Sequence, residues 1–143
     1  MQTAGLIVAV AVILAAAAFG VLRRARDGRV RAVSMSSPAL EQLGVRPGQV
    51  TLVQFSSAFC APCRTTRVVC AEVARTTPGV THVEVDAESH LAQVRELGIR
   101  RTPTVLIVSP TGEVIRRAEG APTLAQLRAA LSALGRSASA PSV

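Results

Sequence analysis

The sequence predicts one α/β domain, in which helices cover both faces of a central mixed sheet, preceded by a single N-terminal transmembrane helix. Two observations predict the domain. Between residues 50 and 134, short β-prone runs alternate with segments whose apolar residues recur at helical spacing. The run TVLIV at residues 104–108 is apolar without interruption, as expected of a strand covered on both sides. At 143 residues, the chain has room for one compact domain and little else.

The predicted anchor is GLIVAVAVILAAAAFGVL, residues 5–22, which is 18 consecutive residues without a charge. Roughly 20 apolar residues cross a bilayer core as a helix, and a buried core helix of this length would show a polar face. A cleaved signal peptide is the alternative. Such a peptide begins with positive charge, whereas no Lys or Arg precedes this run and five arginines crowd between Arg23 and Arg31.

These arginines also predict an orientation. Positive charges favour the cytoplasmic side of a membrane helix, so we expect residues 1–4 outside and everything after Leu22 in the cytoplasm. The expected location is the cell membrane, as a single-pass protein.

The net charge of +7 is concentrated beside the predicted anchor. Residues 23–49 carry six arginines against two acids, and we interpret them as a basic juxtamembrane tether that attracts anionic headgroups. The only aromatic residues are Phe19, Phe55 and Phe59, which provide no platform for stacking bases. Nucleic-acid binding is therefore not expected.

The first half of the domain reads as strand and helix in alternation. Within the tether, Leu40 and Leu43 indicate one helical turn. A strand is predicted at residues 51–55, a helix at 63–76 that ends before Pro78 and Gly79, and a strand at 80–86. The next helix, residues 88–98, has Leu91, Val94 and Leu97 on one stripe.

The second half predicts a hairpin and a last helix. Strands at residues 104–108 and 113–118 flank a turn at residues 110–112. Thr123 can cap a helix that runs to Leu134, with its leucines at 124, 127 and 131 facing inward. The domain is thus expected to span residues 50–134, followed by a disordered tail at residues 135–143.

Cys60 and Cys63 fall where the first strand has ended and a helix begins, one helical turn apart. At this separation two thiols can form a disulfide. The helix dipole favours a negative charge at this end, so Cys60 is expected to be the attacking thiolate and Cys63 the thiol that resolves the mixed disulfide. Pro62 suits the first turn because its missing N–H has no partner there.

Zinc is the rival interpretation of two close cysteines. The other candidate ligands are Cys70, His82 and His90. On one helix, Cys63 and Cys70 would lie roughly 10 Å apart, too far to share a metal, so no metal and no cofactor are expected. Cys70 is expected to be a small buried residue.

The segments VQFSSAFCAPCR and VEVDAESHLAQVRELGIRRTPTVLIVSPTGEVIRRAEG resemble the thioredoxin family over about residues 50–134. The resemblance implies a thioredoxin-like fold and thiol-disulfide exchange with protein disulfides, with electrons supplied by a reductase. It implies a cis Pro103 that faces the cysteines and leaves the backbone of Thr102 for a substrate chain to pair with. Phe59 stands where the family usually has a tryptophan.

The chain departs from the family pattern inside the domain. Gln54 aligns with a buried aspartate, and His82 aligns with its lysine partner. In the family, that carboxylate is thought to take the proton of the resolving thiol, which an amide cannot do. Gln54 and His82 are therefore a possible proton path, in which His82 either accepts a proton or simply packs against the sheet.

The leading interpretation is a membrane-tethered thiol-disulfide oxidoreductase that reduces protein disulfides through Cys60 and Cys63. Two alternatives stay open. An extracytoplasmic protein of the same fold would act on secreted proteins or an apocytochrome, and a redox-silent module would use the groove near Pro103 for binding alone.

Overall fold

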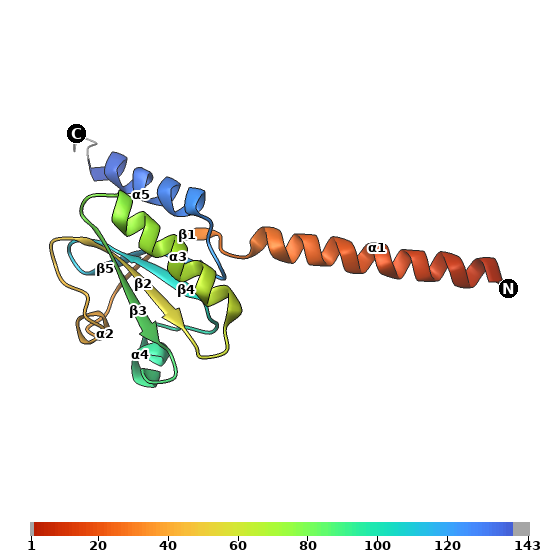
Figure 1. Ribbon diagram of the computed structural model, residues 1–143, viewed down its shortest axis with the longest axis horizontal. Helices are drawn as coiled ribbons and strands as arrows, with labels where there is room; N and C mark the ends of the chain where they lie inside the picture. Colours follow the sequence, from red (N-terminus) through yellow and green to blue (C-terminus); the bar gives the residue numbers. More distant parts are fainter. Residues whose placement is uncertain (1, 139–143) are drawn as a thin grey trace.

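The computed structural model describes residues 2–138, with side chains from residue 4 to residue 135 (Figure 1). The predicted α/β architecture is confirmed, and so is the predicted order of elements after residue 50; the strand β1 before it was not predicted. The helices and strands follow the chain as α1 (Gln2–Arg26), β1 (Val30–Ser36), α2 (Ala39–Gln42), β2 (Val50–Ser56), α3 (Ala61–Thr76), β3 (Val80–Asp86), α4 (Leu91–Glu96), β4 (Thr104–Val108), β5 (Glu113–Glu119) and α5 (Leu124–Ala138).

The strands form one mixed sheet in the order β1-β5-β4-β2-β3. β2 and β3 are parallel, because α3 carries the chain back between them, whereas β4 pairs antiparallel with both β2 and β5. α3 and α5 pack side by side on one face, and the short helices α2 and α4 lie on the other (Figure 1).

Side chains alternate between two apolar layers, one on each face of the sheet. Leu52 on β2 packs with Cys70 and Val73 of α3, whereas the next residue, Val53, and Phe55 point to the layer shared with α2 and α4. A strand with both faces covered is expected to be a continuous apolar run, which explains the sequence of β4, whereas the buried Gln54 interrupts this run in β2. Burying each such side chain contributes on the order of 1.5–3 kcal/mol.

One end of the sheet collects the segments on which the function depends. Near the end of β2, Phe55 pairs with Thr104, the first residue of β4, and Thr104 pairs with Glu119, the last residue of β5. β1 begins beside this point, because Val30 pairs with Ala118. The end of β2, the start of β4 and the departure of α1 therefore share one end of the sheet.

The expected tether over residues 23–49 is wrong for most of its length. Val30–Ser36 is a strand of the sheet. The predicted helical turn is present as Ala39–Gln42, but Leu40 in this turn and Leu43 after it are buried in the core. The Ser, Pro and Gly content suggested a linker, but the apolar residues of this segment cover one sheet face. Part of the sequence attributed to a flexible spacer thus belongs to the folded domain.

α1 is joined to β1 by a short ordered connection. The Gly28 N–H donates to the Glu119 carbonyl at 2.8 Å, and the Asp27 carboxylate pairs with Arg101 at 2.8 Å. Gly28 has φ +70, and a Cβ there would lie 2.2 Å from the Ala121 carbonyl oxygen. Only glycine fits this close approach of two backbones.

Two smaller expectations were also wrong. The helix expected over residues 88–98 is shorter, because α4 spans only Leu91–Glu96; of the predicted stripe, Leu91 is 55% exposed while Leu97 is fully buried. The disordered tail was predicted to begin at residue 135, but α5 continues to Ala138. Residues 139–143 lie outside the described part of the chain. The Thr123 cap is confirmed by its hydroxyl, which accepts from the Gln126 N–H at 3.2 Å.

Candidate active site

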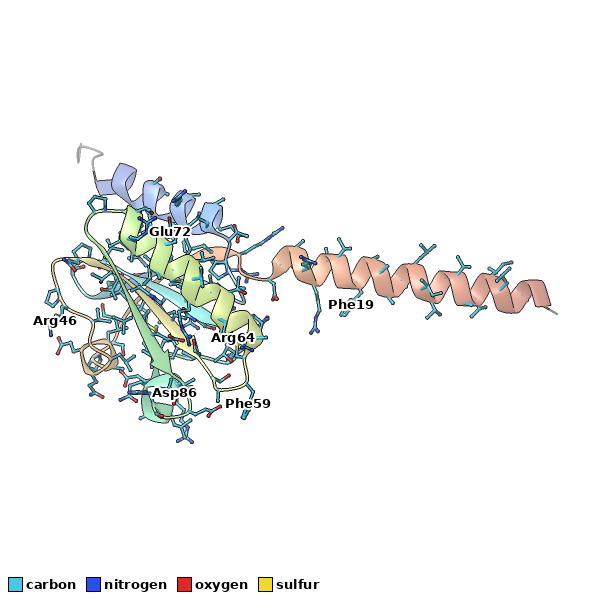
Figure 2. All side chains as sticks on the ribbon, viewed as in Figure 1. Phe19, Arg46, Phe59, Arg64, Glu72 and Asp86 are labelled. Carbon is cyan, nitrogen blue, oxygen red and sulfur yellow. A yellow bond between two sulfur atoms is a disulfide. The ribbon has the colours of Figure 1, made fainter. Side chains whose placement is uncertain are left out.

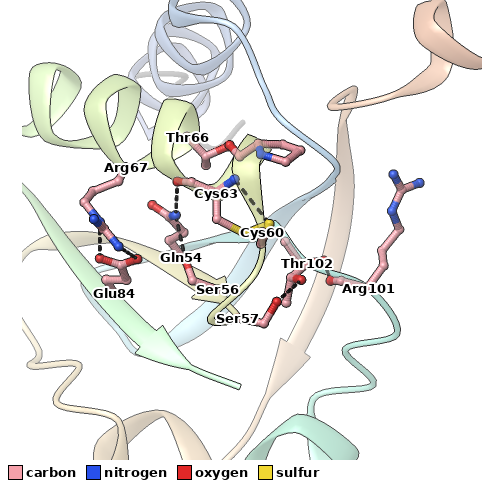
Figure 3. The surroundings of a disulfide bond; sticks show 12 residues. Gln54, Ser56, Ser57, Cys60, Cys63, Thr66, Arg67, Glu84, Arg101 and Thr102 are labelled. Carbon is pink, nitrogen blue, oxygen red and sulfur yellow. Dashed lines mark hydrogen bonds and ion pairs between the residues drawn. A yellow bond between two sulfur atoms is a disulfide. The ribbon is translucent and has the colours of Figure 1, made fainter. Parts of the chain in front are cut away.

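The two cysteines of CAPC are joined in a disulfide at the amino end of α3 (Figure 3). The S–S distance is 2.02 Å and the two Cα atoms are 5.3 Å apart, within the range that a disulfide tolerates. Cys60 is the N-cap of α3, and Pro62 lies in the first turn, where no intrahelical acceptor is lost. β2 ends at Ser56, so the loop of residues 57–59 sets the disulfide at the rim of the sheet.

The two sulfur atoms lie in different surroundings. Cys63 is only 1% exposed, whereas Cys60 is partly exposed and follows the fully exposed Phe59. The Cys60 sulfur accepts the Cys63 N–H at 3.2 Å. In the reduced protein, this donor and the helix dipole would favour a thiolate at Cys60, the sulfur that another molecule can reach.

Thr102 and Pro103 form the second wall of the site. Their peptide bond is cis, as the family resemblance implied. The Thr102 hydroxyl lies 2.9 Å from the Ser57 hydroxyl, which ties the start of β4 to the loop that carries Cys60 (Figure 3). Pro103 is buried, and Thr102 stays half-exposed beside the disulfide loop.

A buried amide, Gln54, stands behind the disulfide. It is fully buried, and its side-chain nitrogen donates to the Cys63 carbonyl oxygen and to the Ser56 hydroxyl, both at 2.9 Å. Because a carbonyl oxygen can only accept, the atom facing Cys63 must be the amide nitrogen. The amide oxygen then faces His82, whose Nε2 is 3.2 Å away.

This orientation of the Gln54 amide determines which ring nitrogen of His82 carries the proton. Since the Gln54 oxygen is an acceptor, the Nε2 of His82 must carry the proton. Burial lowers the pKa of His82, and Arg67 lowers it further, whereas Glu84 acts in the opposite direction. Gln54 links His82 to Cys63, and it bonds the Cys63 carbonyl oxygen and not the sulfur.

An ion pair beside this network was not expected from the sequence. Arg67 and Glu84 form two hydrogen bonds, at 2.5 and 2.8 Å, which lower the pKa of Glu84. The Ser56 hydroxyl lowers that pKa as well, so Gln54, Ser56 and Glu84 form one polar row. The signal was present, because Arg67 follows Cys63 by one helical turn and Glu84 occupies the β3 position paired with Gln54.

The remaining metal candidates lie apart from the disulfide. Cys70 is fully buried, and burial, with a smaller effect of Glu84, raises the pKa of its thiol to about 12. The Nδ1 of His90 lies 2.9 Å from the Asp86 carbonyl oxygen at the start of α4. Within residues 4–135, no three side chains of the metal-binding types gather in one place.

A disulfide between two cysteines three residues apart at a helix start, with a cis-proline after the Thr102 that bonds the preceding loop, is typical of thiol-disulfide oxidoreductases. The sequence profile of the thioredoxin family matches residues 39–133, and the chain belongs to that family. The match begins at α2, which agrees with the place of this helix in the core.

Plant thioredoxins are among its relatives. Thioredoxin H4-1 of Oryza sativa subsp. japonica is 32% identical over 89 residues, which cover 61% of this chain and 67% of the rice protein. Thioredoxin H-type 1 of Nicotiana tabacum is 27% identical over 73 residues, 51% of this chain and 58% of the tobacco protein. The matched segment thus spans between about half and two thirds of these relatives.

Solved structures agree on the fold. A mutant thioredoxin from Halobacterium salinarum NRC-1 superposes with a TM-score of 0.58 at 19% identity, covering 69% of this chain and 86% of the archaeal one. Reduced Schistosoma mansoni thioredoxin gives 0.56 at 19% identity, covering 70% and 92%. At this level of identity, the two structures share the fold of the domain with this chain.

Proposed function

We propose that this protein is a membrane-anchored protein-disulfide reductase whose domain lies in the cytoplasm. The observation that carries the reductase activity is the Cys60–Cys63 disulfide, with one sulfur reachable and the other buried. An exposed Phe59 and the half-exposed Thr102 flank it and would contact an extended substrate chain.

The reaction moves two electrons from the dithiol to the substrate. The Cys60 thiolate attacks one sulfur of a substrate disulfide, forms a mixed disulfide and releases the other sulfur as a thiolate. Cys63, deprotonated, then attacks the Cys60 sulfur, which closes the internal disulfide and frees the second substrate thiol. A reductase resets the pair by the reverse exchange.

The membrane assignment is supported by α1. Ala4–Arg26 has a mean hydropathy of 2.8 over its most apolar window, and none of that window is buried against the domain. The side chains of α1, among them Phe19, extend freely around the helix (Figure 2). At about 1.5 Å per residue such a helix is long enough for a bilayer core, and the arginines after it support a cytoplasmic domain.

Reduction of a protein disulfide tests this proposal. The full chain in detergent, recycled by a chemical dithiol, is expected to reduce many equivalents of a disulfide-bonded substrate protein. Cys70→Ser should retain the rate, because its thiol is buried and uncharged. A single binding event without turnover would instead favour the redox-silent module, which the Gln54 amide makes the second candidate.

Proton removal from Cys63 is expected not to depend on His82. The lowered pKa makes His82 a weaker base than an ordinary histidine, and the nitrogen that faces Gln54, Nε2, already carries a proton. His82→Ala should therefore leave the exchange rate unchanged between about pH 6.5 and 8. Gln54→Asp should raise the rate by about tenfold or more by supplying a base, whereas the uncharged Gln54→Asn should not.

Stopped-flow exchange kinetics across this pH range check these expectations. A loss in His82→Ala confined to this window would identify the histidine as the base.

The same lowered pKa has a consequence for stability. The contribution of neutral His82 to the free energy of unfolding is present above pH 6.5 and is lost as the pH falls below that value. In His82→Ala, the free energy of unfolding, measured by denaturant titration at each pH, should therefore fall less steeply toward acid pH.

A further inference from the structure

A strongly basic cleft separates the end of α1 from the domain. It encloses about 930 Å³ and is lined by seven arginines and two acids. Five of the arginines lie between Arg23 and Arg31, beside the membrane helix. The other two, Arg101 and Arg117, come from the loop before β4 and from β5.

Both acids of the cleft are already engaged by the arginines of the domain. Asp27 pairs with Arg101 at 2.8 Å, and Glu119 lies 3.8 Å from Arg117. For the five arginines beside α1, residues 4–135 offer no carboxylate within ion-pair distance. The cleft thus carries an excess of five positive charges.

Arg117, on the domain side of the cleft, is held by the backbone of the loop before β4. Arg117 is 19% exposed, and its two terminal nitrogens donate to the carbonyl oxygens of Gly98 and Leu97. Its Nε is buried and finds no acceptor among the described side chains and backbone. Because this Nε has no exposed surface, what Arg117 offers to the cleft is its positive charge, held in place by the two backbone carbonyls.

The helix dipole explains part of the cluster but not all of it. Cations are favoured in the last turn of a helix, which suits Arg23, Arg24 and Arg26 of α1. Arg101 and Arg117 do not belong to this turn: they come from elsewhere in the chain and line the same cleft. Their convergence with the juxtamembrane arginines calls for a shared anionic ligand.

The cleft lies at the level of lipid headgroups if α1 spans the bilayer. The 23 residues Ala4–Arg26 extend about 35 Å, close to the roughly 30 Å of a hydrocarbon core, so the last turn of α1 emerges among phosphates. The chain has no lysine, and each guanidinium can hold two phosphate oxygens at once.

We propose that this cleft binds the phosphate of an anionic phospholipid between α1 and the domain. The inference rests on the anchored state proposed above. It bears on the redox site, because Arg101 directly precedes Thr102 and Pro103, and because α1 departs from the end of the sheet where the disulfide lies. A bound headgroup would therefore restrain the loop that carries Thr102 relative to α1.

Hydrogen exchange on the full chain in detergent tests the proposal, with short-chain phosphatidylglycerol, phosphatidylcholine or inorganic phosphate added. Phosphatidylglycerol is expected to protect the backbone amides of residues 27–31 and 98–102, and the other two are not. Equal protection by inorganic phosphate would overturn the lipid assignment in favour of a soluble anion. Absence of protection by phosphatidylglycerol would overturn the site itself.

Variants distinguish a built site from general attraction to charge. Arg101→Gln should raise the half-saturating concentration of phosphatidylglycerol about fivefold, the effect of roughly 1 kcal/mol per arginine near an anionic surface. Asp27→Asn should lower this concentration, because it removes the carboxylate that competes with the lipid phosphate for Arg101. Arg128→Gln removes an exposed charge on α5 outside the cleft and should change nothing.

An equal loss in Arg128→Gln, or unchanged binding in Arg101→Gln, would reduce the effect to unspecific electrostatics and overturn the proposal. All these measurements use the oxidised protein, which needs no exchange chemistry. A failure of lipid binding therefore stays distinct from a failure of disulfide reduction, which is assayed separately.

Discussion

Cells that express Cys63→Ser are expected to accumulate covalent complexes between this protein and its substrates. Cys60 keeps its exposed position and still attacks a substrate disulfide, but the thiol that resolves the mixed disulfide is missing. The complexes should persist after alkylation and separate on reduction, so gel electrophoresis with and without a reductant, followed by mass spectrometry, detects them.

The matched variants give opposite results. Cys60→Ser should form no complexes and lose disulfide exchange altogether, because the buried Cys63 cannot be reached by a protein substrate. Cys70→Ser should behave as wild type. If Cys63→Ser trapped no protein from cells, while the purified wild type turned over a test substrate, the physiological target would be a small disulfide. If neither occurred, the reductase assignment would be wrong.

Removal of residues 2–22 is expected to move the whole protein from the membrane fraction to the soluble fraction. None of the most apolar window of α1 is buried, so the domain loses no core contact with it and should keep its fold. The full chain should resist extraction with alkaline carbonate and should migrate at its uncleaved mass. Sedimentation and intact-mass measurements check both statements.

A topology reporter fused at Val143 decides the side of the membrane. We expect a cytoplasmic signal, and replacement of Arg23, Arg24 and Arg26 by alanine should weaken this bias. A mature chain that begins near Phe19 would show that α1 is a signal peptide. An extracytoplasmic signal with an uncleaved chain would instead favour exchange with secreted proteins or an apocytochrome.

Much of the fold could be predicted because its signals are local. The β3 strand matches its predicted range, Val80–Asp86, since β-branched residues and the flanking Gly79 mark its bounds. The cis bond before Pro103 followed from the family resemblance. β1 was missed because an edge strand with one partner alternates only weakly, and Val30–Ser36 has no fully buried residue.

Only the site residues that are neighbours in the sequence could be predicted to lie together. The cysteines and Phe59 lie together in the sequence, so their positions at the helix start were evident. The row from Gln54 through Ser56 to Glu84 depends on which side chains of neighbouring strands share a face. The convergence of Arg101 with Asp27 spans 74 residues and depends on the tertiary fold alone.

The short junction at Gly28 sets how far the dithiol can reach. A free spacer over residues 23–49 would let the domain sweep a shell with a root-mean-square radius of roughly 30 Å. If α1 is anchored as proposed, the start of β1 at Val30 and the contact of Gly28 with the Ala121 backbone would restrict the domain to a thin layer above the lipid. Disulfides carried by proteins in the same bilayer would then meet the dithiol at a high effective concentration, whereas soluble disulfides would gain nothing from the anchor.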